Sequence, residues 1–141
     1  MKKVINLILL VFWIVIIFLF SNQNGTSSTN SSNIIVKFLY DLTKINEDIL
    51  IVIIRKCAHI FEYFRLYLLT YNCFKEYKTN KYMMISFCIL CGIIDEIHQL
   101  FINGRSGNII DIFVDSIGII IGFILIEVTY GKKKVEKNSS S

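Results

Sequence analysis

The stretch that decides how this chain folds is Arg55-Lys56-Cys57-Ala58-His59-Ile60-Phe61-Glu62-Tyr63, which lies inside a long apolar region. Because successive residues of an α-helix turn by about 100°, Arg55, His59 and Glu62 fall on one narrow stripe. Ionisable side chains at membrane depth are costly, and they usually face the inside of a helix bundle or a water-filled cavity. The stripe is therefore a candidate site.

The composition around this stretch is that of a membrane protein. Of the 141 residues, 54% are hydrophobic and none is proline, and the mean hydropathy is +0.57. A soluble domain of this length is less apolar. The net charge of +4 is small, and Lys and Arg cluster at chain ends and connections, where they orient a membrane protein. We expect the lipid bilayer as a partner and no nucleic acid.

Four apolar segments predict transmembrane helices, at about residues 4–20, 55–74, 82–101 and 109–130. The first could be a secretory signal peptide, but its length and the lack of a small-x-small cleavage site favour a retained helix. The start of the second is ambiguous, because residues 49–54 are also apolar and either continue the helix or lie at the interface. Residues 34–42 have the pattern of an amphipathic interfacial helix.

The positive charges predict the orientation. Lysines at the N-terminus, at residues 75–81 and at residues 132–137 fall on one side of the predicted helices, and the long polar loop falls on the other. Short flanks rich in Lys and Arg stay in the cytoplasm. We therefore predict an all-α fold in the cell membrane. It is a bundle of four transmembrane helices over residues 1–131, with an interfacial helix between the first two, both termini cytoplasmic, and a disordered tail over residues 132–141.

Carboxylates from three of the predicted helices then lie at a similar depth, in the outer half of the membrane. Glu62 lies about 10 Å below Arg55 along the helix, Asp95 lies at a similar depth on the third span, and Asp111 lies near the start of the fourth. Arg55 and Arg105 could simply pair with these acids and fix the register of the bundle. Because so many acidic and imidazole groups converge, we favour a binding or catalytic cavity.

The fourth span carries acids and glycines on one stripe, at Asp111, Asp115, Gly118 and Gly122. The Gly-x-x-x-Gly spacing lets a neighbouring helix pack closely. It indicates that the two aspartates face other helices, and it leaves a homodimer through Gly118 and Gly122 as a further possibility. The four cysteines, including Cys88-x-x-Cys91, have no second pair or flanking histidine of a metal site, and they are interpreted as small buried hydrophobic residues.

These pieces resemble the VanZ-like family of membrane proteins over nearly the whole chain. The matching segments are Phe20-Ser21-Asn22-Gln23, residues 55–63, Asp95-Glu96-Ile97-His98-Gln99, and Gly104-Arg105 followed by Asp111. The resemblance implies a small integral membrane protein, in a family named for a member linked to low-level teicoplanin resistance. The family pattern covers Arg55, Lys56, His59, Glu62, Tyr63, Asp95, Glu96, Gln99, Arg105 and Asp111.

The chain departs from that family pattern at three positions. Asn103 stands where a proline often precedes Gly-Arg, and Asp115 stands where asparagine is frequent. Arg65 stands where an apolar residue is usual, one turn from Glu62, where the two could form a salt bridge. These departures bear on a shared mechanism more than on a shared fold.

Two functions fit a polar cavity just below the outer headgroups. The first is binding of a cell-envelope lipid intermediate or a lipoglycopeptide, with a role in envelope homeostasis or low-level teicoplanin-type resistance. Its ligand-binding residues would be cationic or amide-bearing side chains and one acid, namely Arg55, Lys56, Glu96, Gln99 and Arg105.

The alternative is a membrane-embedded enzyme acting on a phosphate-containing lipid. His59 would be the general base, with Glu62, Asp95 and Asp111 as further catalytic residues. We assign no metal ligand and no cofactor, although His59 and Glu62 at i,i+3 resemble the metal sites of four-helix bundles. Proton-coupled transport ranks last, because the inner half of the predicted bundle has few polar groups.

Overall fold

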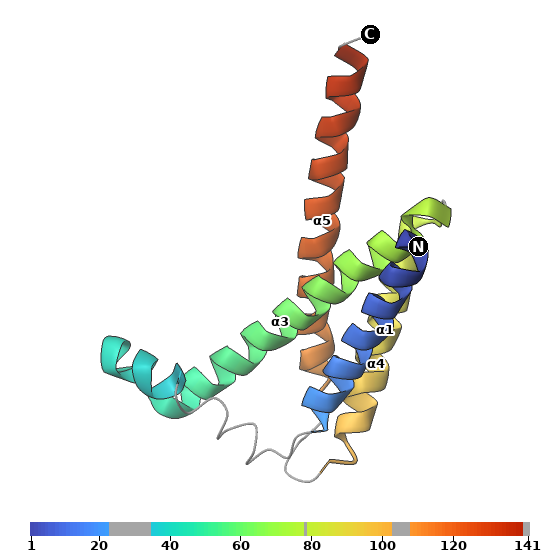
Figure 1. The fold of residues 1–141 in the computed structure, drawn as a ribbon. Helices are drawn as coiled ribbons and strands as arrows, with labels where there is room; N and C mark the ends of the chain where they lie inside the picture. The colour runs from blue at the N-terminus through green and yellow to red at the C-terminus, as the bar shows by residue number, and fades with distance from the viewer. Residues whose placement is uncertain (23–34, 78, 103–107, 140–141) are drawn as a thin grey trace.

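The computed structural model describes residues 1–22, 35–77, 79–102 and 108–139, and these parts of the chain are helical with short connections (Figure 1). The elements are α1 (Lys2–Ser21), α3 (Glu47–Phe74), a 3₁₀ turn η1 (Lys75–Tyr77), α4 (Lys81–Gln99) and α5 (Ile109–Ser139). No strand occurs in the described ranges, so the predicted all-α class is confirmed. Residues 35–43 form a further helix where an amphipathic one is predicted. Its place at a membrane interface remains a prediction.

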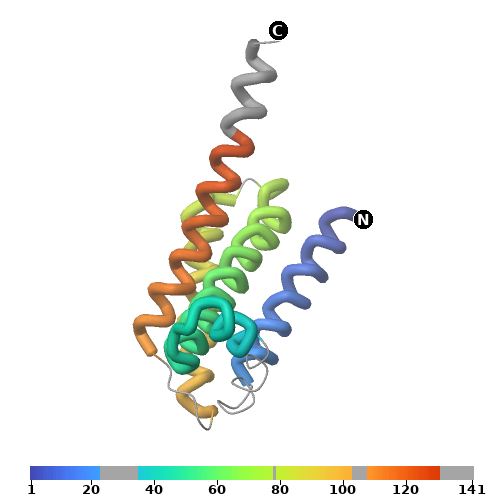
Figure 2. Tube along the Cα trace, turned by 90° about the vertical axis from the view of Figure 1, so that its left-hand side faces the viewer, coloured from blue at the N-terminus to red at the C-terminus, as the bar shows by residue number. Residues whose placement is uncertain are grey.

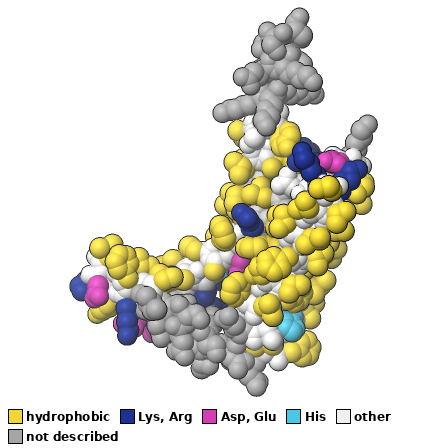
Figure 3. Space-filling view, viewed as in Figure 1, with side chains coloured by type: hydrophobic (Ala, Val, Ile, Leu, Met, Phe, Trp, Pro, Cys, Tyr) yellow, Lys and Arg dark blue, Asp and Glu magenta, His cyan; other side chains and the backbone are white. Residues whose placement is uncertain are grey.

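Three of the described helices are long and apolar enough to cross a membrane: α1, α4, and α5 over Ile109–Tyr130. Large apolar side chains such as Phe12, Leu90 and Phe113 are exposed on them, and hydrophobic side chains cover much of the face in Figure 3. Soluble proteins rarely expose contiguous apolar surface on this scale, so lipid is the natural neighbour. With 28 residues, α3 is long enough but more polar, and its role as a fourth span remains a prediction.

The helix that carries the site begins earlier than the predicted second span. Asn46 caps α3 by accepting a hydrogen bond from the Asp48 backbone N–H at 2.8 Å, and the acidic Glu47 and Asp48 favour a helix N-terminus. Residues 49–54 therefore continue the helix. At the other end of the chain, α5 extends to Ser139, past residue 130 and into the segment 132–141, for which the sequence predicts a disordered tail.

The contact between α3 and α5 is the most extensive one among the described elements. The two helices cross (Figure 1), and α1 and α5 lie on opposite sides of α3 and α4 (Figure 2). Tyr63, Leu66 and Tyr67 of α3 are fully buried at the centre, and residues from the other three helices complete this core, namely Leu10, Ile17, Met84, Cys88 and Ile119. The buried face of α3 therefore faces all three of the other long helices.

Glycine makes the crossing of α3 and α5 possible. A Cβ atom at Gly118 would overlap the Ile60 carbonyl oxygen and lie 2.9 Å from the Phe64 nitrogen, and one at Gly122 would lie 3.1 Å from the Tyr67 ring. The predicted close packing of this stripe is therefore observed, against α3 of the same chain. A homodimer through these two glycines would require α3 to leave α5, so we expect any pairing of two chains to use another face.

Candidate functional site

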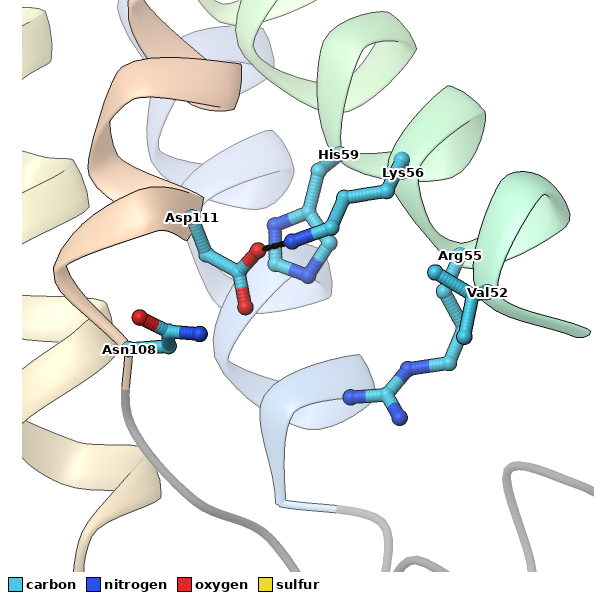
Figure 4. A pocket seen from close by; sticks show the side chains of 6 residues that line it. All are labelled: Val52, Arg55, Lys56, His59, Asn108 and Asp111. Carbon is cyan, nitrogen blue, oxygen red and sulfur yellow. Dashed lines mark ion pairs between the residues drawn. The ribbon is translucent and has the colours of Figure 1, made fainter. Parts of the chain in front are cut away.

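A polar pocket lies between α3 and the start of α5 (Figure 4). Its volume is about 160 Å³, and its lining consists of Val52, Arg55, Lys56, His59, Asn108 and Asp111. The α3 residues recur at helical spacing and so share one face. Asn108 stands directly before α5, where its side chain accepts a hydrogen bond from the Ile110 backbone N–H at 3.0 Å. The pocket thus forms where one face of α3 meets the first turn of α5.

An ion pair joins the two helices that line this pocket. Lys56 of α3 pairs with Asp111 of α5 (Figure 4), and the two side chains are 32% and 11% exposed. Figure 4 also shows the Arg55 guanidinium on the same side of α3. Since Asp111 balances the charge of Lys56, the guanidinium of Arg55 is the group best suited to an incoming anion.

His59 connects the pocket to a more deeply buried group of acids. Its Nδ1 atom lies 3.0 Å from Oδ1 of Asp115, and the two residues are 8% and 1% exposed. Gly92 of α4 has no side chain and so leaves space for Asp115, because a Cβ atom at Gly92 would lie 3.3 Å from Asp115 Oδ2. This hydrogen bond holds the imidazole ring in one orientation, as a histidine that transfers protons requires.

Three polar residues near the end of α4 are buried: Asp95, Glu96 and Gln99. The Gln99 amide nitrogen donates to Asp95 Oδ2 at 3.0 Å and to the Ser21 hydroxyl at 3.2 Å, which joins α4 to the end of α1. Glu96 Oε2 accepts a hydrogen bond from the Asn108 backbone N–H at 2.9 Å. Glu96 therefore holds the start of α5 beside α4.

Glu96, rather than Asp95, is the α4 acid that joins His59. Each of His59, Glu96 and Asp115 offers one possible ligand atom, and these atoms lie within 4.8 Å of one another. The sequence predicts Asp95 as a member of the same cavity as His59, but Asp95 is hydrogen-bonded to Gln99, which also bonds Ser21 of α1.

The other predicted site residues are placed as follows. Glu62 is half-buried and does not line the pocket, and its backbone carbonyl accepts a hydrogen bond from the Trp13 indole at 3.0 Å. The guanidinium of Arg65 lies over the Trp13 ring, 5.7 Å from its centroid. Arg105 and Asn103 lie outside the described residues. Roles in binding or catalysis stay predictions for all the predicted positions.

Two polar residues of the site are absent from the sequence-based set: Asp115 and Asn108. A signal for Asp115 exists, because it lies one turn after Asp111 on the glycine stripe that faces α3. Asn108 could have been recognised as a helix cap, since Asn is favoured directly before a first turn that contains an acid.

The family comparison covers the whole of this site. A family model described as VanZ/LLP1 matches residues 6–130, which include the pocket and the buried acids. No curated protein and no solved structure matches the chain. The site is therefore interpreted from its own geometry.

Proposed function

The chain belongs to the VanZ/LLP1 family, and from this premise we propose that it binds the anionic headgroup of a cell-envelope lipid or lipoglycopeptide. The pocket between α3 and α5 would be the binding site. The observation that carries the proposal is the lining, in which Arg55, Lys56 and His59 of one helix face meet Asn108 and Asp111. Arg and Lys donors recognise phosphate and carboxylate oxygens, and Arg does so with a planar fork.

The size of the pocket suits a headgroup better than a whole ligand. About 160 Å³ is the space of roughly five water molecules at about 30 Å³ each. That volume accepts a phosphate or carboxylate group with its nearest substituents. The apolar part of the ligand would lie along the exposed hydrophobic surfaces of the helices, in the lipid phase.

The placement of the pocket supports an outer-leaflet site. Lys3 of α1 pairs with Glu76 of η1 at 3.6 Å, so the start of α1 lies beside the lysine-rich connection after α3. The pocket lies at the opposite ends of the helices, between the early turns of α3 and of α5. If the lysine-rich end is cytoplasmic, α3 is the fourth span, both termini are inside the cell, and the pocket faces outward.

The test is a binding comparison in lipid nanodiscs. We expect the wild-type protein to retain a polyprenyl phosphate but not the uncharged polyprenol, and Arg55→Gln to weaken phosphate binding by about tenfold, the effect of about 1.4 kcal/mol. Arg65→Gln is the matched control, because Arg65 is exposed and lies over Trp13. Equal retention of the two lipids, or an Arg55 variant equal to wild type, would contradict the proposal.

A physiological arm of the same test uses teicoplanin. Cells that express the wild-type protein should tolerate more teicoplanin than cells that express Arg55→Gln, and membrane lipidomics of the same pair should show a change in polyprenyl-phosphate intermediates. Identical susceptibility and identical lipids in both strains would exclude a role in resistance or envelope homeostasis.

The hydrogen bond between His59 and Asp115 supports a second candidate, an enzyme that acts on the bound phosphate lipid. An imidazole oriented by a buried carboxylate is a suitable general base. Asp115, which is not among the catalytic residues predicted from the sequence, would hold the ring. Turnover of a polyprenyl-phosphate lipid that is lost in His59→Gln and kept in His98→Gln would establish this activity. Binding without turnover would leave the first proposal alone.

A further inference from the structure

Three possible metal ligands from three helices meet behind the pocket. They are His59 of α3, Glu96 of α4 and Asp115 of α5, with exposed fractions of 8%, 4% and 1%. Each residue has one ligand atom within 4.8 Å of the ligand atoms of the other two. Buried charged groups are normally paired or bound to a metal, so the convergence of two carboxylates and an imidazole needs a chemical explanation.

In each of the two carboxylates, one oxygen makes a hydrogen bond and the other oxygen has no hydrogen-bond partner. Asp115 uses Oδ1 with His59, and Glu96 uses Oε2 with the Asn108 backbone. Asp115 Oδ2 and Glu96 Oε1 are buried and have no hydrogen-bond partner. An unpartnered buried oxygen is costly, and a cation between the two acids would satisfy both.

We propose that His59, Glu96 and Asp115 bind one divalent transition-metal ion of the Zn²⁺ or Mn²⁺ type. The ion would take the place of the proton that His59 Nδ1 shares with Asp115 and release it to solvent. One imidazole nitrogen and two carboxylate oxygens suit these ions, whereas Ca²⁺ and Mg²⁺ prefer oxygen ligands alone. Zinc bonds to nitrogen and oxygen of about 2.0–2.2 Å in a tetrahedral site place neighbouring ligand atoms about 3.4 Å apart. Ligand atoms that lie within 4.8 Å of one another therefore need to approach by at most about 1.4 Å.

The ion would have an open coordination position next to the pocket. A catalytic zinc site has three protein ligands and keeps its fourth position for water or substrate. His59 belongs both to the ligand group and to the pocket wall, so the pocket provides a path for an outside ligand. The metal site stands independently of the headgroup proposal, because the three ligands bind the ion whether or not a lipid is present.

The experiment measures metal in the purified full-length protein in detergent. The protein is stripped with a chelator, dialysed against Zn²⁺ and analysed by mass spectrometry of the metal, and its affinity is measured by competition with a chromogenic chelator. We expect about one Zn²⁺ per chain, no displacement by excess Mg²⁺ or Ca²⁺, and at least about tenfold weaker binding in Glu96→Gln and His59→Ala. Co²⁺ should give a visible absorption band in wild type that both variants lose.

Two variants serve as matched controls. His98→Ala removes the other histidine of the chain, which packs against Phe18, and Glu127→Gln removes an exposed α5 acid that pairs with Lys81. Both should bind Zn²⁺ like wild type. Glu96→Gln keeps the shape of the side chain and decides the result if His59→Ala does not fold. A helical, monodisperse wild type without stoichiometric Zn²⁺, or a Glu96→Gln protein that binds Zn²⁺ as tightly as wild type, would overturn the proposal.

Discussion

Lys56 of α3 and Asp111 of α5 form an ion pair that closes one side of the polar pocket. The aspartate is buried and the lysine is about one-third exposed. The pair therefore links two helices whose crossing positions His59, and it sets the charge that an incoming ligand meets.

Removing one partner of the Lys56–Asp111 pair should destabilise the protein more than removing both. Lys56→Met leaves a buried carboxylate without its cation and should lower the free energy of unfolding by about 1–2 kcal/mol. The double variant Lys56→Met with Asp111→Leu should recover part of this loss. Thermal unfolding in detergent measures the cycle. Additive losses would show that the two side chains do not interact.

Gly118→Leu should separate α3 from α5. A side chain at this position would overlap the Ile60 carbonyl, and because backbone cannot yield cheaply, we expect a loss of about 3 kcal/mol or failure to fold. Ile120→Leu, on the exposed side of the same helix, should change stability by less than about 0.5 kcal/mol. Equal thermal stability of the two variants would contradict the observed crossing.

The fluorescence of Trp13 should report the contact between α1 and α3. It is the single tryptophan of the chain, its indole donates to the Glu62 carbonyl, and Arg65 lies over its ring. Arg65→Gln should shift the emission maximum and cost about 0.5–1 kcal/mol, whereas Lys81→Gln, at the start of α4, should leave the emission unchanged. An unaltered spectrum in Arg65→Gln would show that the two side chains are apart.

Gln99→Leu should weaken the junction of α4 with α1. It removes the donor to Asp95 and Ser21 and leaves buried acceptors unsatisfied, at a cost of about 1–3 kcal/mol. Gln99→Glu keeps the size of the side chain but places a carboxylate beside Asp95, so it should be at least as destabilising. Chemical unfolding followed by Trp13 fluorescence measures both. A neutral Gln99→Leu variant would contradict the assigned hydrogen bonds.

The proposed orientation predicts which loops a membrane-impermeant thiol reagent can reach. In a protein whose own cysteines are replaced, a cysteine introduced by Asn108→Cys should react in intact cells, since Asn108 lines the proposed outward pocket. One introduced by Asn80→Cys, at the start of α4, should react only after the cells are opened. The reverse pattern would invert the proposed topology.

The helices and several site residues could be predicted from the sequence. Apolar length predicted α1, α4 and the membrane-length part of α5, and the stripe of Asp111, Asp115 and Gly118 correctly indicated a face turned toward another helix. The starts and ends of helices were harder to predict. Apolar content does not show where a helix is capped, and the start of α3 at Glu47 is set by the Asn46 cap and by packing.

The partner of His59 was decided only by the tertiary structure. Helical spacing determines which side chains share a face within one helix. For that reason the sequence alone placed Arg55, His59 and Glu62 on one stripe and identified acids on two other helices. It does not determine how two helices are rotated about their axes when they pack. Here the close approach at Gly118 sets the rotation of α5 against α3 and brings Asp115 to His59. On α4, Asp95 is hydrogen-bonded to Gln99, and Glu96 is the acid that lies near the histidine.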